Sequence, residues 1–223
     1  MNNLDINIDY SFTSGLGAIE EDRYIKKVTT NVYSGEFADN KKNQFIGQID
    51  LTILLLDSAK TDSFDIYEIF DSEEYTSRLG ETFYDFKNIA LNKKIYMHYN
   101  NSKITNENVC FLETMSINSK YRGIGLGAKL FKDIIFHFKR DASLFVIEPF
   151  PLQFDNEKVD KLTSYKLDLK RLGSQKSEGI KKLTTHYQTW GFEKIKGIRD
   201  LLFFNTQCEN NKFNSINFDD EFN

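Results

Sequence analysis

Apolar and polar residues alternate over several stretches of the chain, as they do in strands with one buried face. Near the N-terminus, Ile6, Ile8 and Tyr10 alternate with polar residues. This alternation, together with runs of β-branched and apolar residues, predicts strands over 1–14, Phe45–Leu56, Lys93–Asn100, Val109–Ile117 and Ile198–Asn205. Residues 18–34 fit either a short helix or a strand, and residues 57–63 are polar and predict a turn.

In three other segments apolar residues recur every three or four positions, which is the period of an amphipathic helix. The predicted helices are Phe64–Leu91, Ala128–Arg140 and Glu178–Gln188. After the middle helix, Leu144–Ile147 is short and wholly apolar, which is typical of a parallel strand covered on both faces.

A glycine-rich turn, Arg122–Gly127, connects the strand Val109–Ile117 to the middle helix. Strand, turn, helix and apolar strand form a β-α-β unit, so the two strands should be parallel. Gly123, Gly125 and Gly127 let the backbone approach a ligand closely, and the first N–H groups of the helix lack internal partners. Together with the charge of Arg122 they predict a site for a phosphate or pyrophosphate group.

The sequence of this turn also allows two alternative roles. The glycines could serve only tight packing between helix and strand. A dinucleotide site is disfavoured, because the spacing G-x-G-x-x-G is absent, although the acidic Glu148 does lie near the end of the next strand. The lysine of a P-loop is absent as well.

Two motifs in this order resemble the GNAT family of N-acetyltransferases. The family pattern Arg/Gln-x-x-Gly-x-Gly/Ala is matched by Arg122, Gly125 and Gly127, and the pattern Tyr-x-x-x-Gly-Phe is matched by Tyr187, Gly191 and Phe192. The chain departs from the family at Ser119, where a proline is common, and in the greater length of residues 152–178.

The resemblance implies a mixed α/β fold with a central, largely antiparallel sheet, a splayed parallel strand pair and flanking helices. It implies a single acyltransferase domain over 1–205, whose cofactor-binding and catalytic half is 109–205. Residues 152–178 would be an insertion, and residues 206–223 a flexible, frayed tail.

The resemblance also implies transfer of an acetyl group from acetyl-CoA to a primary amine by direct attack. Tyr187 would protonate the departing thiolate, and Glu113, Glu148 or a chain of water molecules would take the proton of the amine. The donor would be bound by the backbone of a strand and of the turn, at Met115, Ile117, Arg122, Gly123, Gly125, Gly127 and Ala128. Cys110 would be a core residue, because direct transfer needs no nucleophilic relay.

The charge and the apolar content of the chain limit which binding partners are expected. The net charge of −4 and the absence of a long basic block do not favour a nucleic-acid partner, although aminoacyl-tRNA stays open as an acceptor beside small amines and proteins. The longest apolar run, Ile53–Leu56, is too short to cross a bilayer, and there is no signal-like start, so a cytoplasmic protein without a membrane partner is expected. The scattered histidines predict no metal site. The aromatic run Tyr67–Phe86 fits a core or the surface of a homodimer.

The main alternative is a protein that keeps the acyl-CoA site without catalysis and serves as a regulatory or interaction module. Arg122, the glycines of the turn and Tyr187 favour the enzyme.

Overall fold

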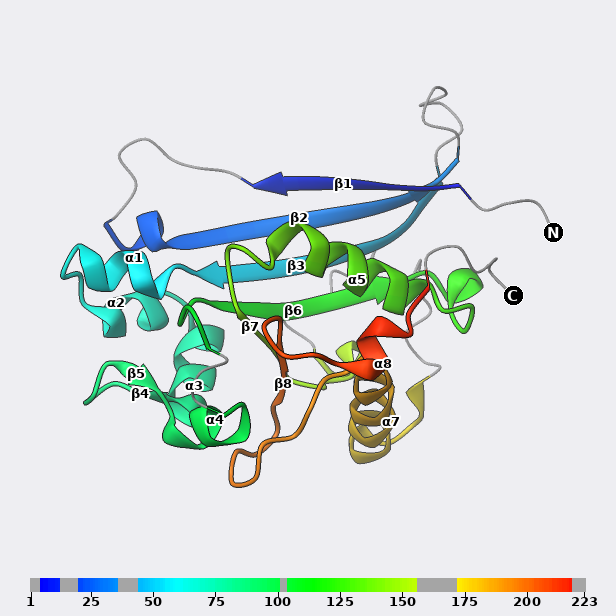
Figure 1. Cartoon of the computed structure of the whole chain (residues 1–223). Coiled ribbons are helices and arrows are strands. Elements are labelled where there is room, and N and C mark those ends of the chain that lie inside the picture. Colours follow the sequence, from blue (N-terminus) through cyan, green and yellow to red (C-terminus); the bar gives the residue numbers. More distant parts are fainter. Residues whose placement is uncertain (1–4, 13–19, 36–43, 101–103, 156–171, 218–223) are drawn as a thin grey trace.

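The computed structural model describes residues 5–12, 20–35, 44–100, 104–155 and 172–217. Their main feature is a six-stranded sheet with the strand order β1-β2-β3-β6-β7-β8 (Figure 1). The strands are β1 (Ile6–Phe12), β2 (Ile25–Ser34), β3 (Gln44–Leu54), β6 (Val109–Ile117), β7 (Leu144–Ile147) and β8 (Leu202–Asn205).

The sheet is largely antiparallel, and β6 and β7 are its parallel pair. The helix α5 (Leu126–Phe138) connects β6 to β7, as the β-α-β pattern predicted. The predicted fold class, a mixed sheet with one parallel pair and flanking helices, is confirmed.

Both faces of the sheet are covered around β6 and β7. Cys110 and Leu112 belong to a core cluster with α5 and with α7 (Lys176–Thr189), whereas Val109 and Phe111 belong to a second cluster on the opposite face. The second cluster is completed by α1 (Leu56–Thr61), α2 (Ile66–Asp71), α3 (Glu74–Phe83) and α4 (Lys93–His98). Coverage of both faces explains why β7 is wholly apolar.

The N-terminal half differs from the sequence prediction at several points. The predicted turn over 57–63 lies largely in the helix α1, and the predicted helix Phe64–Leu91 is two short helices followed by the small hairpin of β4 (Tyr84–Asp85) and β5 (Ala90–Leu91). The predicted strand Lys93–Asn100 is the helix α4. Ile95 in α4 and Tyr99 at its C-terminal end are four residues apart, lie on the same face and are buried, while Met97 between them is 69% exposed. The three apolar residues at 95, 97 and 99 therefore do not share one face, as they would in a strand.

Within the flexible tail predicted over 206–223, residues 206–217 form a turn and the short helix α8 (Asn211–Asn214), and 218–223 lie outside the described residues. The ring of Phe213 contacts those of Phe131 and Phe204, with centroids 5.9 and 4.9 Å apart. In the 152–178 region, Leu152–Phe154 is a 3-10 turn and α7 already begins at Lys176, while the part at 156–171 lies outside the described residues. No helix within the described ranges is long and apolar enough to cross a membrane.

Candidate functional site

The two parallel strands pair only at their beginnings. Val109–Phe111 of β6 pairs with Leu144–Val146 of β7, and β6 then continues to Ile117 while β7 ends at Ile147. Among the described strands, none pairs with this side of β6 beyond Phe111. The result is a strand edge that opens between β6 and β7, as a splayed pair requires.

The register of β6 against β3 decides which backbone groups face this open edge. The N–H of Asn118 donates to the carbonyl of Ile46 at 2.7 Å, and in an antiparallel ladder every second residue bonds to the same neighbour. Ser116 therefore bonds toward β3, and Met115 and Ile117 direct their N–H and C=O groups toward the open edge. The side chain of Arg122 occupies part of that side, because its Nε donates to the carbonyl of Ile117 at 2.6 Å.

The glycine-rich turn begins where β6 ends. A single 3-10 turn, Ser119–Tyr121, is anchored by the buried Tyr121, whose hydroxyl lies 3.2 Å from both the Ser34 hydroxyl and the Gln44 side-chain oxygen. Gly123 and Gly125 then adopt φ of +81° and +80°, which other residues adopt only with strain. A Cβ at either position would have no described atom within 4 Å, so their backbone borders open space.

Gly125 is the N-cap residue of α5, and a glycine has no side chain with which to cap a helix. The N–H of Lys129 donates to the carbonyl of Gly125, which leaves the amides before Lys129 without partners inside the helix. Ala128 is the third residue of α5 and lies in this first turn. An uncapped first turn beside open space can bind an anion.

Gly127 has a different role from the other two glycines. It lies inside α5, and a Cβ there would meet the ring of Trp190 at 2.9 and 3.0 Å. The tight packing that the sequence left open as an alternative therefore applies to Gly127, while its N–H still belongs to the uncapped turn.

Tyr187 lies near the C-terminus of α7 and is 7% exposed. Its ring contacts those of Trp190 and Phe192, with centroids 5.0 and 6.0 Å apart. Burial raises the pKa of Tyr187 above its ordinary value, so the phenol keeps its proton at neutral pH. The adjacent His186 is exposed, which agrees with the divergence of consecutive side chains on a helix.

The two candidate bases are held differently. Glu113 is an extra residue in β6, because Leu112 pairs with Leu51 and Thr114 with Asp50. Such a bulge re-aims a side chain and is common beside active sites. The hydroxyl of Thr52 donates to Glu113 at 2.5 Å. Glu148, just after β7, instead accepts from both terminal nitrogens of Arg78 at 3.1 and 2.7 Å.

Two residues of this region, Tyr75 and Arg78 of α3, were not among the candidates that the sequence suggested. The ring of Tyr75 contacts that of Phe111, the last paired residue of β6, with centroids 6.0 Å apart, and the Arg78 guanidinium lies 5.8 Å from the Tyr75 ring centroid. Burial raises the pKa of Tyr75, and the charges of Glu113 and Glu148 raise it further. Both residues come from the half of the chain without a recognised motif, where the only signal was the helical period.

Cys110 is fully buried on the α5 face, and burial raises the pKa of its thiol. A thiol held protonated in the core is a poor nucleophile. This agrees with the expectation that Cys110 is a core residue.

Two solved structures resemble this chain weakly over most of its length. A tyrosine-to-phenylalanine mutant of KacT aligns over 91% of this chain and 95% of its own, with 12% sequence identity and a TM-score of 0.41. AtaT complexed with acetyl-methionyl-tRNAfMet aligns over 91% of this chain and 96% of its own, also with 12% identity and a TM-score of 0.41. No protein-family model matches the chain, and no curated protein matches it in sequence. The expectation that nucleic acid is not a partner gains no support from these comparisons.

The contact between Gly127 and Trp190 gives a test of the turn. In Gly127→Ala, overpacking against the buried ring costs about 1–3 kcal/mol, while alanine favours the helix by about 1 kcal/mol. We expect the free energy of unfolding in urea to fall by about 1 kcal/mol and the emission of Trp190, the single tryptophan, to shift.

Gly123→Ala is the matched control. Its positive φ strains an alanine without touching Trp190, so stability should fall while the native emission stays unchanged. Unchanged stability and emission in Gly127→Ala would contradict the packing role.

Proposed function

We propose that the chain is an N-acyltransferase that transfers an acetyl group from acetyl-CoA to a primary amine. The observation that carries the proposal is the continuity of the open edge of β6 with the uncapped first turn of α5, which Trp190 connects to the ring of the buried Tyr187. An elongated donor with amide groups at one end and a pyrophosphate at the other matches this arrangement.

The backbone would hold the donor. The outward N–H and C=O groups of Met115 and the N–H of Ile117 can bond the pantetheine amides as an added strand would. The N–H groups from Gly123 to Ala128 would bind the pyrophosphate, with the helix dipole favouring its negative charge. Arg122, whose side chain is bonded to the Ile117 carbonyl, would place its guanidinium where the pantetheine arm of the donor meets its pyrophosphate.

Direct attack fits the side chains around the opening. The amine nitrogen forms a bond to the acetyl carbonyl carbon, the carbon–sulfur bond breaks, and the departing thiolate takes the proton of the Tyr187 phenol. An alkyl thiol has a pKa near 8.5, so a phenol that is protonated at neutral pH can supply this proton. The buried thiol of Cys110 supports transfer without a covalent enzyme intermediate.

We assign the base role to Glu113, directly or through water. Glu113 lies at the bulge and accepts from the neutral hydroxyl of Thr52, whereas both oxygens of Glu148 accept from the charged guanidinium of Arg78. Glu148 then belongs, with Tyr75 and Arg78, to the wall of the acceptor side. Two carboxylates against one guanidinium favour a cationic acceptor. Polyamines, aminoglycoside-like amines, protein lysines or N-termini, and aminoacyl-tRNA remain the classes to be assayed.

Binding of acetyl-CoA is the first test of this proposal. We expect micromolar binding to the wild type by calorimetry and none to Gly125→Glu, because a carboxylate at the N-cap fills the open space and repels the pyrophosphate.

Gly197→Glu is the matched control, since Gly197 is exposed, has a φ of +83° and lies outside the turn. It places the same charge at a positive φ, where the new side chain meets the flexible end of Lys94, and it should bind acetyl-CoA as the wild type does. Equal binding of acetyl-CoA to Gly125→Glu, or no binding of acetyl-CoA to the wild type, would overturn the acyltransferase proposal.

Turnover separates the enzyme from a non-catalytic acyl-CoA-binding module. In Tyr187→Phe, loss of the proton donor should lower kcat about a hundredfold or more and leave the affinity for acetyl-CoA unchanged. Tyr67→Phe, at an exposed and remote tyrosine, should keep full kcat.

The pH profile follows from the direction of the pKa shift. Because burial raises the pKa of Tyr187 above its ordinary value near 10, the acid stays protonated, and kcat/KM should rise with pH as the amine loses its proton, without a fall below about pH 10. A wild-type protein that binds acetyl-CoA and turns over no amine would support the non-catalytic module.

A further inference from the structure

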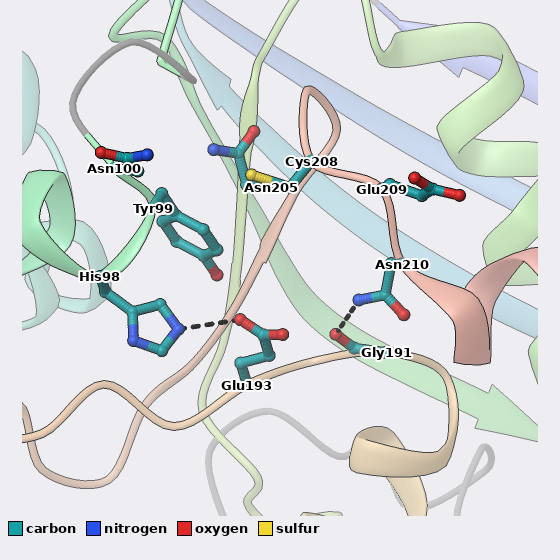
Figure 2. Close-up of a pocket in the computed structure, with 9 residues that line it drawn as sticks. All are labelled: His98, Tyr99, Asn100, Gly191, Glu193, Asn205, Cys208, Glu209 and Asn210. Carbon is teal, nitrogen blue, oxygen red and sulfur yellow. Dashed lines mark hydrogen bonds and ion pairs between the residues drawn. The ribbon is translucent and has the colours of Figure 1, made fainter.

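A second concave site lies at the turn that follows the helix α7. It has a volume of about 340 Å³. Figure 2 shows its walls, which come from the end of α4, the turn after α7, the end of β8 and the segment before α8. Its described lining residues are His98, Tyr99, Asn100, Gly191, Glu193, Asn205, Cys208, Glu209 and Asn210. None of their side chains has a role in the proposed acyl transfer.

The pocket carries negative charge. Glu193 and Glu209 both line it, and the single basic side chain among the described lining residues is His98, whose Nε2 lies 2.8 Å from a Glu193 oxygen. Glu209 is exposed and forms no ion pair with any described residue. The fourteen-residue helix α7 ends at this pocket, and the C-terminal end of a helix also favours cations.

An unpaired polar group lies in the wall. Tyr99 is 6% exposed, and its hydroxyl is buried without a hydrogen-bond partner within the described part of the chain. Figure 2 shows the ring projecting so that its hydroxyl is directed toward Glu193. Burial, with the nearby charges of Glu193 and Cys208, raises the pKa of this phenol, so it stays a neutral hydroxyl. A buried hydroxyl without a partner costs folding free energy, and a ligand that bonds to it recovers that cost.

Hydrogen bonds between the lining segments hold part of the pocket wall in a defined conformation. The side-chain amide of Asn210 donates to the carbonyl of Gly191 at 2.8 Å, and its oxygen accepts from the N–H of Phe213 at 3.1 Å. A Cβ at Gly191 would lie 2.6 Å from the Asn210 side chain, so the turn after α7 and the segment before α8 pack tightly against each other here. The backbone of Glu193 is bonded to Phe203 in both directions. These contacts fix the backbone of the wall at Gly191 and Glu193 before any ligand arrives.

We propose that this pocket is a second binding site, separate from the acyl-transfer site, for a small organic cation with amino or guanidino groups. The cation donates hydrogen bonds to the carboxylates of Glu193 and Glu209 and to the hydroxyl oxygen of Tyr99. An ammonium or guanidinium group has no acceptor and several donors, which matches a wall of carboxylate, amide and hydroxyl oxygens. The site stands independently of the proposed acyl transfer, because it uses none of the same side chains.

The experiment is calorimetric titration of the full chain, without acetyl-CoA, with agmatine and with putrescine. The diol with the carbon chain of putrescine is the uncharged control. We expect both cations to bind and the diol to be silent. In the double variant Glu193→Gln and Glu209→Gln, affinity should fall about tenfold or more, because ion-paired hydrogen bonds to carboxylates become hydrogen bonds from the cation to neutral amides.

Tyr99→Phe tests the hydroxyl separately. It removes an unpaired buried group at nearly constant volume, so the Tm of the free protein should stay the same or rise, while the affinity for the cations falls. A fall in Tm with unchanged affinity would show that the hydroxyl is structural and would contradict its role in binding.

Glu113→Gln distinguishes the two sites, because a cation could also bind as an acceptor. Affinity for the cations unchanged in Glu113→Gln and lost in the double variant supports the second site, whatever the outcome of the acetyl-CoA titration. Absence of binding by either cation, or binding lost in Glu113→Gln and kept in the double variant, overturns it.

Discussion

The shortness of the pairing between β6 and β7 is the constraint on which the rest of the site depends. Three residue pairs join the two strands before β6 continues alone toward the glycine-rich turn. If the pairing continued, the N–H groups of Met115 and Ile117 would be bonded to β7 and unavailable to a ligand. Glu148 and Pro149 follow β7 immediately, and a proline has no N–H with which to extend a ladder.

The bulge at Glu113 supports the same geometry. An extra residue reverses which alternate positions face each side of a sheet. Cys110 and Leu112 face α5 before the bulge, and Met115 and Ile117 pack against that same core cluster after it. One inserted residue thus keeps the apolar face continuous with α5 and sets a carboxylate at the point where the strands diverge. On the opposite face, Tyr75 packs against Phe111 there.

The segment 109–147 was predictable because each of its elements has a strong local signal. Residues 109–147 have one apolar strand, three glycines and one long amphipathic helix, and the structure places their boundaries within two residues of the prediction. The helices α1 and α4 were not predictable in the same way. They are too short to show a clear period, and they gain their stability from burial of a few residues, such as Leu56 and Ile95, in the second core cluster.

Some residues of the two sites could be predicted from local sequence motifs, and others could not. The positions of the turn and of Tyr187 follow motifs that can be read along the chain, and their backbone geometry follows from glycine and from the helix entry. Tyr75, Arg78 and the pocket beside Tyr99 depend on contacts between segments distant in sequence, such as Arg78 with Glu148 and Asn210 with Gly191. Such contacts become visible only when the chain is folded.

The central claim is that the open edge of β6 receives the acyl donor as an added strand. Residue-resolved hydrogen exchange of the β6 amides, with and without acetyl-CoA, tests it most directly. We predict that the donor slows exchange at Met115 and Ile117 and leaves Ser116 nearly unchanged, because Ser116 is already bonded to β3. Equal protection at all three amides, or none at Met115 and Ile117 while acetyl-CoA is bound, would contradict it.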